Sequence, residues 1–395
     1  MVVPNGWALK PLEKIMRIRK ERVNPQAYKN IRCIELEHIE PESGQLLGWI
    51  ESKNQRSLKA MFTAGDVLFG KLRPYLRKYY YPNFDGVCST EFWVFTACDD
   101  SVDNNYIYYI VQTNRFLETA NSTTGTKMPR ADWSLMKEVS FSVPLSLHEQ
   151  RTTVTALSDV DKYITVFEKL IAKKRAIKQG AMQELLTGKR RLPGYKGEWV
   201  EKQLGEISEV RMCKRIFAHQ TVASGDIPFY KIGTFGKQPD AYISRALYEE
   251  YINKYSYPNK GDILLSAAGT IGRTVVFDGT PSYYQDSNIV WLEIDKSEIC
   301  NEYLYHYYQV IEWASPEGST ISRLYNGIIK ATIIKLPPTL AEQRAIAAVL
   351  SDMDAEIAAL TSKLEKARRI KQGMMSELLT GRIRLIEGDV DNGKN

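Results

Sequence analysis

The chain has 395 residues, a net charge of +6, and 44% hydrophobic and 25% charged residues. This composition is typical of folded proteins and excludes the disordered and fibrous classes. The length allows two domains of ordinary size, and the lack of a secretory signal or a long apolar run predicts a cytoplasmic protein.

The cysteines do not indicate a disulfide framework or a zinc site. They are odd in number, scattered, and never form a C-x-x-C pair. We expect them to be free thiols, mostly buried: Cys33, Cys88, Cys98, Cys213 and Cys300.

Residues 1–143 form the first predicted domain. It opens with Trp7 and a short apolar segment, and a strand-like run, VLF, starts at Val67. A buried-strand pattern, FWVFTA, starts at Phe92, and an aromatic-rich helix, NNYIYYIVQ, starts at Asn104. A Gly-Thr loop and a last strand lead into the next segment.

Residues 144–192 predict one long helix. Its apolar residues are three and four positions apart, as in a coiled coil. From Leu147 to Thr187 the helix would be roughly 60 Å long at 1.5 Å per residue. It ends in Thr-Gly, with Lys and Arg in the last turns, where a helix C-terminus favours cations.

The second half of the chain repeats this order. Residues 193–336 again contain an early Trp199, a run ILL from Ile263, a strand NIVWLEI from Asn288 and an aromatic-rich helix from Asn301. Residues 337–395 contain a second long helix and the C-terminal tail. The segment IKQGAMQELLTGKRRL of the first helix returns as IKQGMMSELLTGRIRL in the second, unchanged at 12 of 16 positions.

A helix with one apolar stripe is stable only when the stripe meets another, so we expect the two copies to pair. The predicted fold class is α+β: two α/β domains separated by two long antiparallel helices that form an intramolecular coiled coil, with approximate two-fold symmetry. The alternative is that each helix packs on its own domain. The residues predicted to pair the helices are Leu157, Val160, Ile164, Phe167, Ile171, Leu350, Met353, Ile357, Leu360 and Leu364.

Basic and aromatic residues gather in loops of both domains, which favours contact with DNA, because Arg and Lys reach phosphates and Arg reads base edges. In the first domain they lie in GKLRPYLRKYYYP and TGTKMPR. The alternative is that these basic residues form a solvated rim and that the tyrosines belong to the core. The candidates for DNA binding are Lys71, Arg73, Arg77, Lys78, Lys127, Arg130, Lys231, Lys237, Thr270, Arg273, Arg323, Tyr325 and Lys330.

Motifs for catalysis and metal binding are missing. The sequence has no phosphate-binding G-x-x-x-x-G-K-[ST] loop and no H-E-x-x-H, and its four histidines are widely separated. The segment GTIG from Gly269 lies between two strand-like runs and predicts a tight turn. A nuclease site around Glu42, Glu51 and Lys53 is an alternative that such common loop residues support weakly. We therefore predict no catalytic residue and no metal ligand.

The sequence resembles the specificity subunits of type I restriction-modification systems. The resemblance rests on PLSLHEQR and PPTLAEQR before the helices, on the repeated KQG and ELLTG, and on GDVLFGKLRPYLRKYYYPNFDGVCSTEF and GDILLSAAGTIGRTVVF. It implies a non-catalytic subunit whose two target-recognition domains each read half of a split, asymmetric DNA site.

The resemblance also implies the partners. The helices would act as a spacer and as a docking surface for two methyltransferase subunits, and restriction and motor subunits would complete the assembly. S-adenosylmethionine, ATP and Mg would belong to those partners, with no cofactor in this chain.

Two other functions stay open at this stage. One is a self-contained metal-dependent nuclease or nuclease-methyltransferase, which would cleave or methylate DNA by itself. The other is a structural scaffold that joins proteins through its coiled coil without any DNA sequence preference.

Overall fold

The computed structural model describes residues 3–28, 31–122, 128–313 and 323–385. The chain folds into two compact units. Unit 1 contains Met1–Glu168 and Ser362–Asn395, and unit 2 contains Lys169–Thr361. The predicted domain boundaries lie near the helix ends, whereas the units divide within the two long helices.

Unit 1 begins with strands and short helices. Its β-strands are β1 (Trp7–Pro11), β2 (Met16–Ile18), β3 (Arg22–Val23), β4 (Arg32–Ile34), β5 (Ile50–Glu51), β6 (Lys59–Phe62), β7 (Val67–Gly70), β8 (Tyr79–Tyr80), β9 (Gly86–Ser89), β10 (Phe92–Ala97) and β11 (Ser140–Pro144). Its short helices are α1 (Leu12–Ile15), α2 (Asn104–Ile110), α3 (Asn114–Asn121) and α4 (Trp133–Met136), with 3-10 turns η1 (Pro25–Ala27), η2 (Leu36–His38), η3 (Ser52–Asn54) and η4 (Pro74–Leu76).

The core of unit 1 lies on both faces of β10. This strand is central in an antiparallel sheet of order β2-β10-β7-β8. Trp93 and Phe95 face a cluster that includes α2 and α3, whereas Phe92 and Val94 face a second cluster formed with the sheet β3-β6-β9-β4-β5. Burial on both faces explains why FWVFTA is continuously apolar. β1 and β11 form a separate antiparallel pair.

Unit 2 repeats this plan with one smaller sheet. Its β-strands are β12 (Val200–Gln203), β13 (Ser208–Arg211), β14 (Ile227–Tyr230), β15 (Tyr242–Ile243), β16 (Ile263–Ser266), β17 (Thr274–Val276), β18 (Tyr283–Tyr284), β19 (Ile289–Ile294) and β20 (Ile333–Leu336). Its short helices are α6 (Leu204–Ile207), α7 (Arg245–Lys254), α8 (Asn301–Tyr307) and α9 (Asn326–Ala331), with the turn η5 (Ala218–Gln220).

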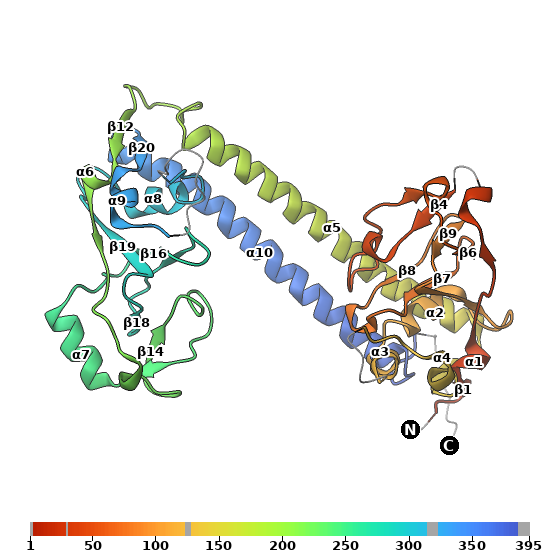
Figure 1. Cartoon of the computed structure of the whole chain (residues 1–395). Helices are drawn as coiled ribbons and strands as arrows, with labels where there is room; N and C mark the ends of the chain where they lie inside the picture. Colours follow the sequence, from red (N-terminus) through yellow and green to blue (C-terminus); the bar gives the residue numbers. More distant parts are fainter. Residues whose placement is uncertain (1–2, 29–30, 123–127, 314–322, 386–395) are drawn as a thin grey trace, which may run out of the picture. The chain divides into compact units, whose positions relative to one another are not determined.

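The sheets of unit 2 correspond to those of unit 1. The order β13-β19-β16-β17 matches β2-β10-β7-β8, and β12-β20 matches β1-β11. The sheet β15-β14-β18 has three strands where unit 1 has five. In Figure 1 the elements β16, β19 and α8 of unit 2 lie together. The fold is therefore α+β, with two repeated domains, as the sequence predicts.

The two long helices are α5 (Leu147–Leu185) and α10 (Leu340–Leu378), each of 39 residues. The predicted helix from Leu147 to Thr187 is confirmed to within two residues. In unit 1, the last part of α10 lies beside the first part of α5, and unit 2 contains the other two parts (Figure 1).

Three residues after each long helix, a glycine packs on a tryptophan. Gly188 and Gly381 both have φ of +73°, a left-handed conformation that favours glycine. A Cβ atom at Gly188 would lie 3.1 Å from the ring of Trp199, and one at Gly381 would lie 3.1 Å from the ring of Trp7. The repeated Thr-Gly ending thus allows a close contact with the early tryptophan of each half.

A buried ion pair joins the start of α5 to the segment that follows α10 within unit 1. Arg384 Nε lies 2.7 Å from Glu149 Oε1, and the indole Nε1 of Trp7 donates to the same carboxylate at 3.0 Å. Glu149 is only 2% exposed. Burial raises the pKa of Glu149, but hydrogen bonds from Arg384 and Trp7 outweigh it, so that the pKa lies below its usual value.

A second contact in unit 1 uses the lysine of the repeated KQG motif. Lys371 Nζ lies 2.7 Å from Asp161 Oδ1 and donates to Gln112 Oε1 at 2.8 Å. Tyr109 donates its hydroxyl to Asp161 Oδ2 at 2.9 Å. We call these four residues the unit 1 clamp. They connect α10, α5 and the end of α2.

Unit 2 contains the corresponding ion pairs with the helices exchanged. Arg191 Nη2 lies 2.6 Å from Glu342 Oε2. Lys178 Nζ lies 2.6 Å from Asp354 Oδ1 and 3.2 Å from Gln309 Oε1. Each helix position is the unit 1 position shifted by 193 residues. In both units the residue number rises along one helix as it falls along the other, so the helix segments are antiparallel.

The predicted stripe residues are all removed from solvent to some degree. Leu157 belongs to the cluster that contains Leu378, and Leu350 belongs to the cluster that contains Leu185, so each cluster contains residues of both helices and of the domain. A pairing role for the whole stripe stays a proposal. Leu157, Ile171, Leu350 and Leu364 are buried, and Val160, Ile164, Phe167, Met353, Ile357 and Leu360 are partly buried.

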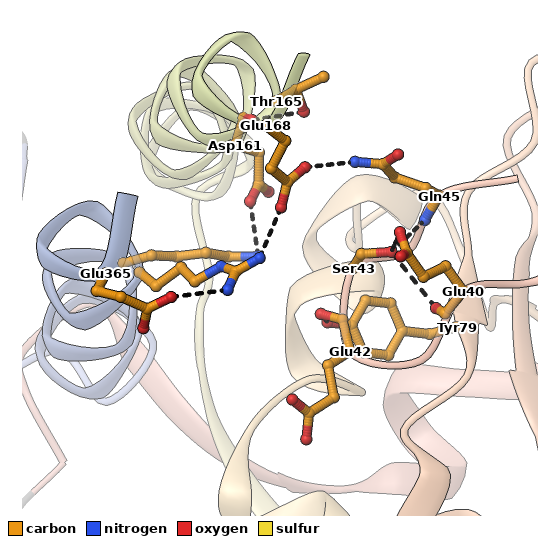
Figure 2. Close-up of polar contacts among 11 residues, drawn as sticks. Glu40, Glu42, Ser43, Gln45, Tyr79, Asp161, Thr165, Glu168 and Glu365 are labelled. Atoms are coloured by element: carbon orange, nitrogen blue, oxygen red, sulfur yellow. Dashed lines mark hydrogen bonds and ion pairs between the residues drawn. The ribbon is translucent and has the colours of Figure 1, made fainter. Parts of the chain in front are cut away.

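A third connection ties a loop of unit 1 to the helices (Figure 2). Gln45 donates to Glu168 Oε2 at 2.6 Å, and Glu168 Oε1 pairs with Arg368 at 2.8 Å. Arg368 also pairs with Glu365 at 3.0 Å, and Figure 2 shows this contact as a dashed line from the Glu365 carboxylate. Ser43 donates to Glu40 at 2.9 Å in the same loop. These contacts hold the loop of residues 40–45 against α5.

Lys178, Asp354, Gln309 and His306 form the unit 2 clamp, in which His306 takes the place of Tyr109. His306 is 1% exposed, with Nε2 3.0 Å from Ser351 Oγ and Nδ1 3.9 Å from Asp354 Oδ2. Burial and the positive charge of Lys178 lower the pKa of His306, and Asp354 opposes them in part. Folding therefore favours the neutral imidazole.

Because His306 stands in the unit 2 clamp, we expect the stability of this clamp to depend on pH. The unfolded chain binds the His306 proton near its usual pKa of about 6.5, and the folded chain binds it only at lower pH. Stability is therefore full above about pH 6.5 and falls as the pH drops below it. Urea unfolding at pH 7.5 and pH 5.5 measures this loss. His306→Tyr, which copies Tyr109, should lose less stability on acidification; an equal loss in both proteins would contradict the prediction.

Candidate nucleic-acid interface

The basic loop after β7 is held against a second chain segment in unit 1. The amide of Lys71 donates to the Glu91 carbonyl at 2.9 Å, and the amide of Ala131 donates to the Lys71 carbonyl at 2.9 Å. The amide of Arg73 donates to the Pro129 carbonyl at 2.8 Å. Residues 129–131 therefore run along the start of the hairpin loop.

Unit 2 builds the same arrangement after β16. The amide of Ala267 donates to the Asn288 carbonyl at 2.8 Å, and the amide of Leu324 donates to the Ala267 carbonyl at 2.8 Å. An isolated bridge joins Ala268 to Arg323, as another joins Leu72 to Arg130 in unit 1. Arg130 and Arg323 thus occupy the same place. Each unit presents a hairpin loop beside an arginine-bearing segment.

The predicted DNA-binding residues of unit 1 divide into two groups. Lys71, Arg73 and Arg130 lie together at the hairpin loop, and Arg130 pairs with Glu91 through two contacts of 3.1 Å. Arg73 is exposed, and across the described residues its side chain has no hydrogen bond, ion pair or aromatic contact.

Two further candidates in unit 1 are held by other parts of the protein. Arg77 lines a cavity of about 1120 Å³, where it contacts Asn114 Oδ1 at 3.3 Å. Lys78 donates to the Leu36 carbonyl at 2.6 Å, and burial lowers its pKa. Lys127 lies outside the described residues.

In unit 2 the structure brings together Lys237, Thr270 and Arg273, which line a pocket of about 270 Å³. Arg273 donates to the Phe235 carbonyl at 3.0 Å, so its side chain is fixed at this pocket. Gly269 and Gly272 have φ of +65° and +82°, and they lie between β16 and β17, so GTIG is the predicted tight turn.

The remaining candidates of unit 2 have partners of their own. Arg323 donates to the Ser287 carbonyl at 2.9 Å and lies 5.8 Å from the ring of Tyr325, which is 63% exposed. Lys231 pairs with Asp240 at 2.9 Å, and Lys330 pairs with Glu209 at 3.0 Å. A residue already paired with a carboxylate has less charge to offer to a phosphate.

In the part of the chain that the structure describes, no group of three or more His, Cys, Asp or Glu could hold a metal ion. Glu51 and Lys53 pair with each other on the surface. Within the same residues, no helix is long and apolar enough to cross a membrane.

Sequence reasoning missed the partners of the repeated helix motifs. The missed residues in unit 1 are Tyr109 and Gln112, and those in unit 2 are His306 and Gln309. An alignment of the two aromatic-rich helices would have found them, because the glutamine ends both. No sequence pattern indicated Glu91 as the partner of Arg130.

The family description of a type I restriction modification DNA specificity domain fits this chain twice, over residues 5–178 and 196–369. The chain belongs to this DNA specificity family. The two matches begin near the two early tryptophans and end within the two long helices, so the family unit is the repeat itself.

Similar proteins have the same description. A putative type I restriction enzyme specificity subunit of Haemophilus influenzae is 56% identical over 165 residues, which are 42% of this chain and 43% of that protein. The EcoDI specificity subunit of Escherichia coli is 24% identical over 229 residues, 56% of this chain and 51% of that protein. The match thus spans about half of each of these relatives or less. The MjaVIII specificity subunit of Methanocaldococcus jannaschii is 25% identical over 385 residues, 91% of this chain and 83% of that protein.

Two solved structures share the fold of this DNA specificity family member. A chain from work on complex assembly and conformational transition of the type I restriction-modification system aligns with a TM-score of 0.62 and 20% identity, over 97% of this chain and 100% of that chain. The S subunit of the type I system from M. genitalium aligns with a TM-score of 0.59 and 14% identity, over 96% and 98%.

Proposed function

We propose that this chain is the sequence-specificity subunit of a type I restriction-modification complex. Residues 1–143 and residues 193–336 each read one half of a two-part, asymmetric DNA site. The observation that carries the proposal is that the same hairpin-loop backbone arrangement occurs in both units with different side chains. Lys71 and Arg73 in unit 1 correspond to Ala267 and Gly269 in unit 2.

Different side chains on one backbone frame are what two unlike half-sites require. Sequence is read by side chains that reach base edges, and contacts with phosphates fix the register of the protein on the duplex. The loop of unit 1 offers three basic residues, whereas the pocket of unit 2 offers Lys237, Thr270 and Arg273. The two regions would therefore recognise different bases.

We infer that the paired helices connect the readers to partner subunits and set the distance between the two half-sites. The equivalent helix contacts in the two units offer equivalent surfaces to two methyltransferase subunits, and restriction and motor subunits complete the assembly. S-adenosylmethionine, ATP and Mg belong to these partners. The relatives named as restriction enzyme specificity subunits support this assignment.

Replacing residues 1–143 by the corresponding region of another family member should change one half of the methylated site and leave the other half unchanged. The reason is that residues 193–336 keep their own contacts. Methylated positions would be mapped in DNA from cells that contain the chimera and its partner subunits. A site changed in both halves, or in neither, would contradict the proposal.

Two further experiments distinguish the other candidate functions. Cleavage or methylation by the purified chain with added metal or S-adenosylmethionine would favour the self-contained nuclease or nuclease-methyltransferase. Assembly with partner proteins but no DNA sequence preference would favour the scaffold.

A further inference from the structure

Two arginines of unit 1 adopt a backbone conformation that the equivalent positions of unit 2 give to glycine. Arg73 and Arg77 both have φ of +51°, in the left-handed region. L-residues with a Cβ atom rarely adopt this region, because the Cβ atom approaches the following carbonyl oxygen. Glycine has no such cost.

The strand pairing establishes which residues correspond. Gly70 lies opposite Phe92, the first residue of β10, and Ser266 lies opposite Ile289, the first residue of β19. Counting three residues forward from each places Arg73 with Gly269, whose φ is +65°.

The return of the hairpin gives the second correspondence. The amide of Gly70 donates to the Lys78 carbonyl at 2.8 Å, and the amide of Ser266 donates to the Arg273 carbonyl at 2.8 Å. The residue before each carbonyl is Arg77 in unit 1 and Gly272 in unit 2, with φ of +51° and +82°.

The conformation at Arg73 is further disfavoured by the next residue. Arg73 has ψ of 60° and is followed by Pro74, whereas a residue before proline prefers extended backbone. The loop holds it there through hydrogen bonds from the Arg73 amide to the Pro129 carbonyl at 2.8 Å and from the Leu76 amide to the Arg73 carbonyl at 2.9 Å. Such strain persists where the surroundings impose it, and it gathers at functional sites.

The side chain of Arg73 makes no polar or ring contact that would stabilise the described fold. In the part of the chain that the structure describes, it makes no hydrogen bond, ion pair or ring contact, whereas Arg77 contacts Asn114 and Glu42. Its surroundings are exposed as well: Tyr75 is 53% exposed and Met128 is 47% exposed. An exposed arginine in a glycine position, without a side-chain partner among the described residues, is available to bind a molecule outside the chain.

We propose that Arg73 is a specificity-determining residue of unit 1 that enters the major groove and reads a guanine in the first half-site. This inference rests on the proposed function. The guanidinium fork of arginine fits the O6 and N7 atoms of guanine, and Lys71, in the same loop, supplies positive charge for an adjacent phosphate.

The test compares three variants of the full chain in complex with its methyltransferase. Arg73→Ala removes the side chain and keeps the Cβ atom, whereas Arg73→Gly removes both. Arg56→Gly, at an exposed arginine in another loop of unit 1, controls for the lost charge. Methylated sites are mapped, binding to the wild-type site is measured at several salt concentrations, and melting temperatures are recorded.

Both Arg73 variants should lose the preference for guanine at one position of the first half-site, by roughly 10-fold to 100-fold, and keep the second half-site. Arg73→Gly should also melt above Arg73→Ala, by about 2 °C, because only glycine relieves the backbone. Arg56→Gly should keep both half-sites.

Two results would overturn the inference. One is unchanged base preference with uniformly weaker binding and a salt slope reduced by about 1, which marks a phosphate contact. The other is unchanged preference and unchanged binding. If replacing residues 1–143 changes the first half-site while Arg73 variants do not, this inference alone fails. If that replacement changes neither half, the proposed function fails with it.

Discussion

Arg384→Ala is expected to lower the free energy of unfolding by about 3 kcal/mol, because it leaves the buried Glu149 carboxylate without its cationic partner. Arg384 contacts both carboxylate oxygens, at 2.7 Å and 2.8 Å, and Trp7 alone would remain. Removing one member of a buried pair costs more than the pair contributes, since the remaining charge stays out of water. Urea unfolding of the full chain at pH 7.5 measures the effect.

The chain offers a matched control two residues away. Arg382 pairs with Glu377 at 2.9 Å, but both side chains are more than a third exposed, so Arg382→Ala should change stability by less than about 1 kcal/mol. The double variant Arg384→Ala with Glu149→Gln should recover part of the loss, because it removes the unpaired charge. Equal effects of Arg384→Ala and Arg382→Ala would show that the buried pair does not hold the helix ends.

The Glu149 pair also has a pH dependence. Since the folded chain lowers the pKa of Glu149 below its usual 4.5, the carboxylate stabilises the fold above that pH and stops doing so as the pH falls below it. Arg384→Ala should therefore be closer to the wild type in stability at pH 3.5 than at pH 7.5. A constant difference would assign the effect of Arg384 to packing.

The sequence predicted the elements whose pattern is local. The three-and-four spacing of apolar residues gave α5 to within two residues, and the apolar run from Phe92 is β10. It could not give the order β3-β6-β9-β4-β5, because short strands from distant parts of the chain pair through backbone groups that any residue carries. The repeat indicated two similar domains without giving their sheets.

The candidate interface shows the same division. Clusters of Lys and Arg indicated two segments that the fold brings together, since Lys71, Arg73 and Arg130 lie at one hairpin loop. Composition could not show which basic residues already have partners inside the protein, as Lys78 and Lys330 do. It also could not show that Arg73 takes a left-handed conformation, because that depends on the fold of the hairpin.

The repeated helix motifs were visible in the sequence, but their contacts were not. The sequence showed KQG twice, but only the folded chain shows Lys371 at Asp161 and Lys178 at Asp354. These aspartates end the segments SDVD, which starts at Ser158, and SDMD, which starts at Ser351. The lysine of each helix copy thus binds the aspartate of the other copy.

Removing seven residues from each helix should shorten the gap between the two DNA half-sites. The segments are residues 164–170 and residues 357–363, which are related by the 193-residue shift. A seven-residue deletion keeps the apolar stripe in phase. Lys178 is 17 positions after Asp161, and Lys371 is 17 positions after Asp354, so equal deletions between them keep both clamps in register.

The expected size follows from helix and duplex geometry. Seven residues correspond to about 10 Å of helix. At roughly 3.4 Å per base pair, this is about three base pairs of DNA. A deletion in α5 alone is the control: it leaves the clamps out of register, so the protein should lose stability in urea unfolding.

The decisive measurement is the spacer length in the sites methylated by the doubly shortened protein and its partners. The account predicts two unchanged half-sites separated by about three fewer base pairs than in the wild type. An unchanged spacer, from a protein that folds and methylates normally, would contradict the claim that the paired helix copies set the distance between two readers.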